Sequence, residues 1–107
     1  MYFTVNGSEW LLKFVNPTNH HLVRSDGSRT IGVSDNNIKT VFIADNLSEY
    51  MTDKVLCHEL CHVYSFENNL TIPIEIEEII ADFMSLYGRE IIYLADNIMS
   101  GVLRRVA

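Results

Sequence analysis

The residues of this chain best suited to do chemistry form one short run, His58-Glu59-Leu60-Cys61-His62. Two histidines four positions apart are neighbours on one face of a helix, so both imidazoles can bind the same metal ion. A glutamate between them can reach a water molecule on that ion without being a ligand itself. The run therefore predicts a metal centre in which His58 and His62 are ligands and Glu59 is the general base.

The sequence around this run predicts the helix that such a site requires. Ser48 is a typical N-cap residue, Glu49 follows it in the first turn, and the amphipathic pattern continues to Phe66. The same pattern also occurs in helices that carry two histidines and bind no metal. A second element that supplies another ligand would separate these two interpretations, because a catalytic zinc ion usually has three protein ligands and one open position.

A second helix is predicted from about Pro73 to Tyr87. Proline is tolerated in the first turn of a helix, and the apolar residues that follow recur at helical spacing. These apolar residues are Ile76, Ile79, Ile80, Phe83, Met84 and Tyr87. Three carboxylates of this helix, Glu75, Glu78 and Asp82, lie close together on a different side. The third metal ligand is therefore expected among them.

The run Glu78-Ile79-Ile80-Ala81-Asp82, placed downstream of the histidine pair, resembles the gluzincin arrangement, and it is most similar to the ImmA/IrrE-type family of small metallopeptidases. The resemblance implies that Glu78 is the third zinc ligand. It also implies that Asp82 supports a zinc-bound histidine from outside the ligand set, most plausibly His58. A ligating imidazole needs such an acceptor at its other ring nitrogen to fix its tautomer and its ring plane.

The same resemblance implies an activity. We expect one Zn²⁺ per chain and hydrolysis of a peptide bond in an intracellular protein. The substrate class implied by the family is a regulatory protein such as a repressor, often in phages or mobile elements.

The segments before the histidine run indicate a small sheet. Strands are predicted at 1–6 and 40–44, and a hairpin is predicted to join 22–24 to 30–33 through Asp26-Gly27. Residues 9–15 fit either a helix or a strand. The predicted fold class is α+β with a minimal zincin-like fold. A mostly antiparallel N-terminal sheet precedes the active-site helix and a C-terminal helical part, and the resemblance of this order to a zincin implies that an edge strand lies over the metal.

The chain beyond Tyr87 continues a helical apolar stripe through residues 91–94, 98–99 and 102–103. Gly88 either ends the second helix or is an interior glycine. This last segment is expected to be scaffold, or an oligomer contact if its stripe stays exposed. The oligomeric state is left open.

Composition restricts the classes of protein that fit. With 107 residues and 48% hydrophobic content, the chain is expected to be one metallopeptidase-like domain over residues 1–107. A net charge of −6 argues against direct nucleic-acid binding. We also expect no membrane segment, because there is no run of eighteen apolar residues and no basic leader. Cys57 and Cys61 are poorly placed for a disulfide, and reduced thiols suit the expected cytoplasmic location.

Two other functions are alternatives to a zinc peptidase that cuts a protein or peptide substrate. One is another H-E-x-x-H amide hydrolase, such as a deformylase-like enzyme, which would require a cysteine or histidine ligand from a distant strand. The other is a non-catalytic, zinc-containing regulatory binding module of antirepressor type. No role is assigned to His20, His21 or the tyrosines.

Overall fold

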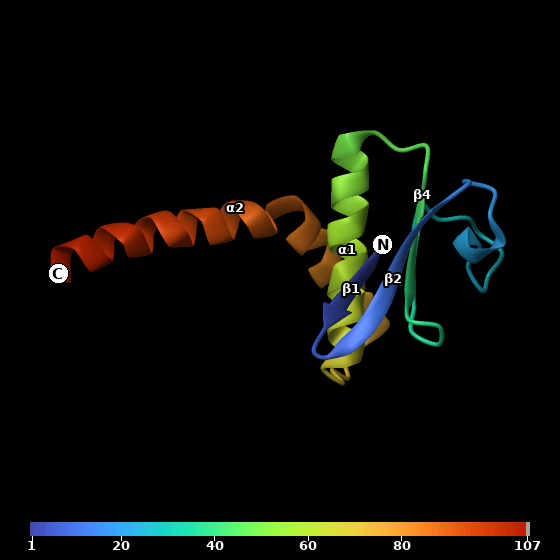
Figure 1. Cartoon of the computed structure of the whole chain (residues 1–107), viewed down its shortest axis with the longest axis horizontal. Helices are drawn as coiled ribbons and strands as arrows, with labels where there is room; N and C mark the ends of the chain where they lie inside the picture. Colours follow the sequence, from blue (N-terminus) through green and yellow to red (C-terminus); the bar gives the residue numbers. More distant parts are fainter. Residues whose placement is uncertain (107) are drawn as a thin grey trace.

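The structure, a computed structural model, describes residues 1–106, with side chains up to residue 104. It confirms the α+β class, because a four-stranded sheet is followed by two helices (Figure 1). The strands are β1 (Tyr2–Val5), β2 (Ser8–Val15), β3 (Gly32–Asp35) and β4 (Thr40–Ala44), with a short 3₁₀ helix, η1 (His20–Leu22), between β2 and β3. The helices are α1 (Glu49–Glu67) and α2 (Ile74–Val106).

The sheet is mixed, with strand order β1-β2-β4-β3. The outer pairs β1–β2 and β3–β4 are antiparallel, as expected, whereas the central pair β2–β4 is parallel. After β2 the chain passes through η1 and β3. Strand β4 then lies beside β2 and runs parallel to it. Strand β3 therefore becomes an edge of the sheet.

Residues 9–15, which fit two kinds of element, belong to strand β2. Trp10 and Leu12 are buried on the same face of the sheet, as the two-residue period of a strand requires. Trp10 also stacks on Phe66 of α1, with ring centroids 6.4 Å apart. This packing against the helix decides between the two alternatives.

The hairpin predicted between residues 22–24 and 30–33 forms only in part. Gly27 does take up the positive φ (84°) of the expected turn, but only Val23 and Arg29 form a bridge around it. Leu22 belongs to η1, where its fully buried side chain packs with Phe42 of β4. The backbone carbonyl of Leu22 accepts a hydrogen bond of 2.9 Å from the N–H of Thr30, but the hairpin extends no further, because Gly32–Asp35 pairs with β4 instead.

Helix α1 begins as predicted. The Ser48 side chain accepts a hydrogen bond from the backbone N–H of Met51, which caps the first turn. The helix lies along one face of the sheet (Figure 1), where Val55 and Val63 join the core formed by β2 and β4. This packing directs the next face of the helix, which carries the histidines, towards α2.

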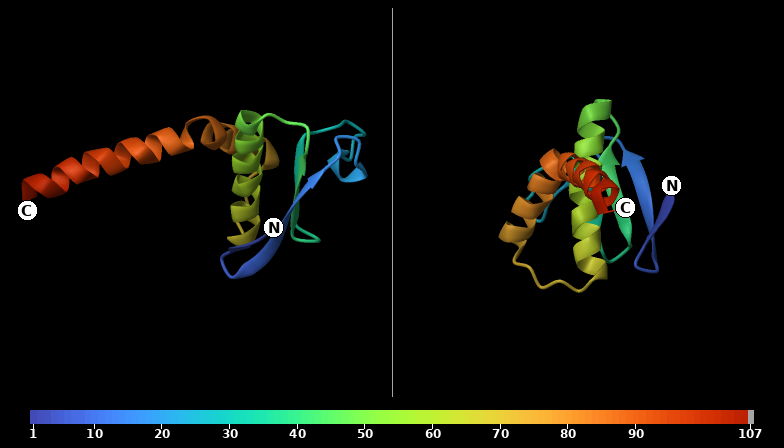
Figure 2. Two further views of the ribbon diagram at one scale, coloured as in Figure 1. Left: turned by 45° about the horizontal axis from the view of Figure 1, so that its top comes forward. Right: turned by 90° about the vertical axis from the view of Figure 1, so that its left-hand side faces the viewer.

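Helix α2 runs without interruption through Gly88, which is therefore an interior glycine. Its first part packs along α1, and it then changes direction and projects from the rest of the molecule (Figure 2). The radius of gyration is 16.3 Å, whereas a compact domain of this length has about 13 Å. The apolar stripe of the projecting part stays exposed, with Ile91, Leu94 and Ile98 at 47–58%. Within residues 1–106, none of the helices has the length and apolar character needed to span a membrane.

Candidate metal centre

The structure brings together the side chains of His58, His62 and Glu78 where α1 and α2 meet. The two Nε2 atoms lie 3.2 Å apart. The Glu78 carboxylate lies 2.7 Å from Nε2 of His62 and 3.3 Å from Nε2 of His58. Zn–N and Zn–O bonds of about 2.0–2.2 Å in a tetrahedral site place neighbouring ligand atoms roughly 3.3 Å apart. The three side chains therefore fit one zinc ion, and the donor set of two imidazoles and one carboxylate suits it.

Asp82 lies behind His58, where the sequence predicted an acceptor. Its carboxylate is 2.9 Å from Nδ1 of His58. A carboxylate can only accept here, so this contact places the proton of the neutral imidazole on Nδ1 and leaves the Nε2 lone pair facing the other two ligands. Glu78 and Asp82 are one helical turn apart, which is why one helix supplies both the ligand and the acceptor.

Glu77 is a buried carboxylate beside the site that sequence analysis did not place there. Its side chain is buried, and one carboxylate oxygen lies 3.6 Å from Nδ1 of His62. The other oxygen has no hydrogen-bond partner among the described residues. Ala81 and Gly88 lie on the same face of α2 and are also buried. Ala81, four residues from Glu77, was the available signal that this face of α2 is covered, whereas Gly88 lies against the Met84 side chain of its own helix.

The predicted general base, Glu59, faces the sheet side of the site. Its side chain is buried, and Oε1 accepts a hydrogen bond of 2.9 Å from the Ser34 hydroxyl of β3. Burial raises the pKa of the Glu59 carboxyl, while the Ser34 hydrogen bond and the nearby histidines oppose that shift. No sequence signal pointed to Ser34, because its contact depends on how β3 crosses α1.

Gly32 allows this crossing. A Cβ atom added at Gly32 would lie 2.5 Å from Cγ1 of Val55 and 3.2 Å from the Glu59 side chain. Real Cβ atoms do not approach other atoms as closely as the first of these distances, so a side chain at this position would force Val55 or β3 to shift. The absence of a side chain at Gly32 therefore keeps the edge strand beside the base.

An open cleft of about 840 Å³ gives access to the site. It is lined by β3, by the histidine face of α1 and by the start of α2, and it includes His58, Glu59, His62, Glu78 and Asp82.

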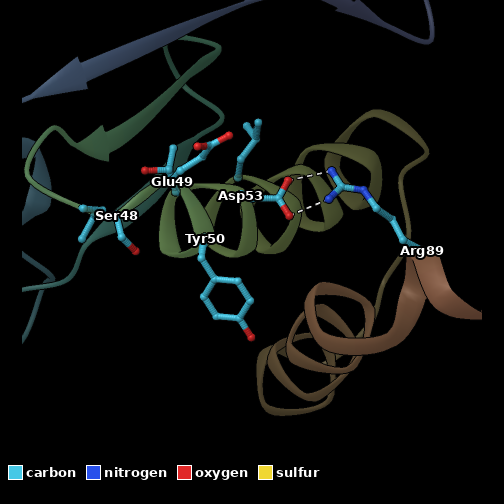
Figure 3. Close-up of a pocket in the computed structure, with 8 residues that line it drawn as sticks. Ser48, Glu49, Tyr50, Asp53 and Arg89 are labelled. Carbon is cyan, nitrogen blue, oxygen red and sulfur yellow. Dashed lines mark hydrogen bonds and ion pairs between the residues drawn. The ribbon is translucent and has the colours of Figure 1, made fainter.

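A second hollow lies at the N-terminal end of α1 (Figure 3). There both guanidinium nitrogens of Arg89 contact the Asp53 carboxylate at 2.6 and 2.7 Å. This bidentate pair joins α2 to α1 close to the point where α2 leaves the body of the molecule.

The remaining residues weighed from sequence lie outside the ligand cluster. Glu75 is exposed. Cys57 and Cys61 are free, half-buried thiols that line an apolar groove, and Cys57 is directed at the carbonyl oxygen of Met84. His21 stacks on Phe42 with ring centroids 4.0 Å apart, which is a packing role.

Comparison with known proteins agrees with this geometry. The model of the IrrE N-terminal-like domain, Peptidase_M78, matches residues 15–100, which include both helical motifs and the strands β3 and β4. Searches of curated proteins and of solved structures gave no match. The match covers most of the 107-residue chain. The chain therefore belongs to the IrrE N-terminal-like domain family, which is a metallopeptidase family.

Proposed function

We propose that this protein is a zinc-dependent peptidase that hydrolyses a peptide bond in an intracellular protein. In keeping with the family resemblance, we propose that the substrate is a regulatory protein such as a repressor, in a phage or another mobile element. The observation that carries the proposal is the buried Glu59 carboxylate, which lines the same open cleft as the three-ligand cluster. A purely structural zinc site has no use for a buried base beside an open cleft.

His58, His62 and Glu78 would hold the metal ion. A zinc ion bound there polarises a carbonyl group and lowers the pKa of water towards about 7. Glu59 accepts the proton of the attacking water and returns it to the leaving amine. Ser34 holds the Glu59 carboxylate in place, and Asp82 holds the ring of His58.

The position of β3 suggests how the substrate binds. This strand is an edge of the sheet and lines the cleft beside Glu59. An extended peptide can add to an edge strand through main-chain hydrogen bonds. A substrate bound in this way would lie along β3 with one of its peptide bonds at the metal, so we propose that the cleaved segment is unfolded or extended.

The two alternatives receive less support. A deformylase-like site needs a distant cysteine or histidine ligand, but both cysteines lie on α1 and line a different groove. A non-catalytic zinc module would give no reason for Ser34 to hold Glu59 beside the ligands. Both alternatives make measurable predictions that differ from those of a peptidase.

The test combines metal analysis with cleavage. Protein purified without added metal should contain about one equivalent of zinc, and a mixture-based peptide library should gain new amino termini when it is incubated with this protein. Glu59→Gln should retain zinc and the far-UV spectrum of the wild type. It should lose cleavage by roughly 10²- to 10⁴-fold, because the amide cannot accept a proton.

The outcomes separate the possibilities. Zinc retention without cleavage that depends on Glu59 would favour the binding module, and cleavage at the wild-type rate by Glu59→Gln would place the base elsewhere. Absence of zinc, with no restoration on adding the metal, would contradict the metal centre itself.

A further inference from the structure

The cleft in front of the metal centre has two ends that differ in charge. Gly32 lies against Val55, and Ser34 reaches the backbone carbonyl of Glu59 one helical turn further along α1, so β3 and α1 run in roughly the same direction. The end of the cleft that comes before these contacts is lined by Arg24, Ile31, Met51 and Lys54, whereas the opposite end is lined by Phe66 and Ile74. We call the first of these the basic end.

The basic end carries two cations without an anionic partner. Arg24 and Lys54 are the two side chains of Arg or Lys among the described residues that line the cleft. Neither forms an ion pair with a carboxylate of the described chain. The Arg24 guanidinium donates to the Thr30 hydroxyl at 3.4 Å, and the Lys54 ammonium lies 4.7 Å from the centre of the Tyr50 ring. Both charges are therefore available to a ligand, in a chain whose net charge is −6.

The carboxylates nearest in sequence to these two cations have other partners. Asp26 accepts hydrogen bonds from the N–H and the hydroxyl of Ser28 at 2.9 and 2.6 Å. Asp53 is held by both guanidinium nitrogens of Arg89. A carboxylate that enters the basic end would therefore not have to displace one that is already bound there.

The position of Lys54 along α1 sets its distance from the metal centre. Lys54 precedes His58 by four residues, so the two side chains share a face of the helix. Four helical residues rise about 6 Å, which corresponds to about two residues of an extended peptide at roughly 3.3 Å each. A peptide whose cleaved bond lies at the metal therefore places the side chain about two or three residues away beside Lys54.

The direction of β3 decides which half of the peptide reaches the basic end. Strand β3 begins at the basic end and then passes Glu59. Antiparallel strand pairs are more common than parallel pairs and slightly more stable per residue. A peptide that adds to β3 in the antiparallel direction runs towards the basic end, so the residues that follow the cleaved bond lie there.

We propose that the basic end is a specificity subsite, which binds an Asp or Glu side chain about two or three residues after the cleaved bond. Lys54 and Arg24 are the residues that determine this preference. The inference rests on the proposed peptidase function and narrows its substrate to an extended segment that is acidic on the carboxyl side of the cleaved bond. An Asn or Gln in the same place has the same shape but lacks the charge that these two residues attract.

The test begins with the cleavage sites that the zinc-loaded wild type selects from a mixture-based peptide library. Asp and Glu should be enriched at the second or third position after the cleaved bond. Two peptides that differ only by Asp or Asn at that position then measure the preference. The Asp peptide should have the higher kcat/KM by about 5-fold, the upper end of what one exposed charge pair contributes.

Charge reversal assigns the preference to residues. Lys54→Glu should lower the ratio of the two kcat/KM values to about one, because the new carboxylate offsets Arg24. The double variant Arg24→Glu/Lys54→Glu should invert the ratio. Lys13→Glu is the matched control, because it makes the same change of charge on β2, where Lys13 lines a different hollow, and it should keep the wild-type ratio. All these variants should retain zinc, since none of them removes a ligand.

The outcomes distinguish this inference from the proposed function. Cleavage without enrichment of Asp or Glu, enrichment before the cleaved bond, or a ratio that survives in the double variant would overturn the subsite and leave the peptidase in place. If the zinc-loaded wild type cleaves no peptide of the library, the proposed function itself fails, and the subsite fails with it.

Discussion

The two sides of α1 do different work in the candidate site. On the side that faces α2, His58 and His62 contact a set of carboxylates that all come from one helical turn. On the side that faces the sheet, Glu59 is buried under the edge strand and is held by Ser34. On the proposed function, metal retention would depend on the helix pair, whereas proton transfer would depend on the sheet. Substitutions on the two sides should therefore affect different measurements.

The largest effect is expected when the helix side loses its carboxylate ligand. Glu78→Ala should lower zinc affinity by more than the roughly 100-fold that loss of an outer partner can cost, because a direct ligand is removed. Competition with a chromophoric chelator measures this affinity. Glu75→Ala removes an exposed carboxylate from the same helix and should leave the affinity unchanged. Equal losses of zinc affinity in both variants would show that the metal is held by the overall negative charge of the helix, without a specific carboxylate ligand.

Loss of the carboxylates that lie behind the two histidines, those of Asp82 and Glu77, should have the next largest effect. Asp82→Ala should weaken zinc binding or activity by roughly 10- to 100-fold, as expected when a ligating imidazole loses its acceptor. Glu77→Gln makes the corresponding change beside His62. We expect a smaller loss there, because the 3.6 Å separation is longer than a hydrogen bond. Cobalt-substituted protein gives a second readout, since its visible spectrum reports the ligand geometry. If the zinc affinity and the rate of Asp82→Ala are both within twofold of the wild type, Asp82 is an ordinary surface charge.

On the sheet side, Ser34→Ala should change the rate and leave the metal in place. Ser34 donates to the Glu59 carboxylate and lies 3.0 Å from the backbone carbonyl of the same residue. Loss of one such hydrogen bond corresponds to a fall in rate of roughly 3- to 10-fold. Ser85→Ala is the matched control, because Ser85 lines the same cleft but bonds to a carbonyl of its own helix. A loss of zinc from Ser34→Ala would mean that the two sides are not separable.

The smallest effect concerns how α1 is anchored to the sheet. Lys39 and Trp10 both donate to Glu67, and the Lys39 contact is the main reason that the pKa of Glu67 falls from 4.5 to about 2. A lowered pKa in the folded state stabilises the fold above pH 4.5, and this contribution is lost as the pH falls towards 2. Denaturant unfolding should therefore show Glu67→Gln as less stable than wild type at pH 7, with the difference shrinking below pH 4.5. A difference that does not depend on pH would exclude this ion pair as its source.

Much of the site could be predicted because its residues lie close together in the sequence. The spacing within a helix fixes which side chains share a face, and this is why His58 and His62 could be paired from the sequence. Glu78 and Asp82 were assigned through the resemblance to a known family. Ser34 could not be found in this way, because its contact with Glu59 is made across 25 positions of the chain. Similarly, the hairpin at residues 22–33 was predicted to be too long, because Gly32 and Val33 pair with a strand that lies later in the chain. The resemblance to a family identified ligands, but it carried no information about Glu77.

The placement of all the metal-facing groups between residues 58 and 82 has a kinetic consequence. Contacts between residues close in sequence form faster than distant ones, because less loop entropy is lost when they meet. The α1–α2 hairpin is therefore expected to assemble early, so that the ligands come together before the sheet is complete. Strand β3 must then dock against a helix that is already formed, and at Gly32 there is no room for a Cβ atom beside Val55 of that helix. A side chain at that position would slow the last step of folding while leaving the metal-binding hairpin able to form.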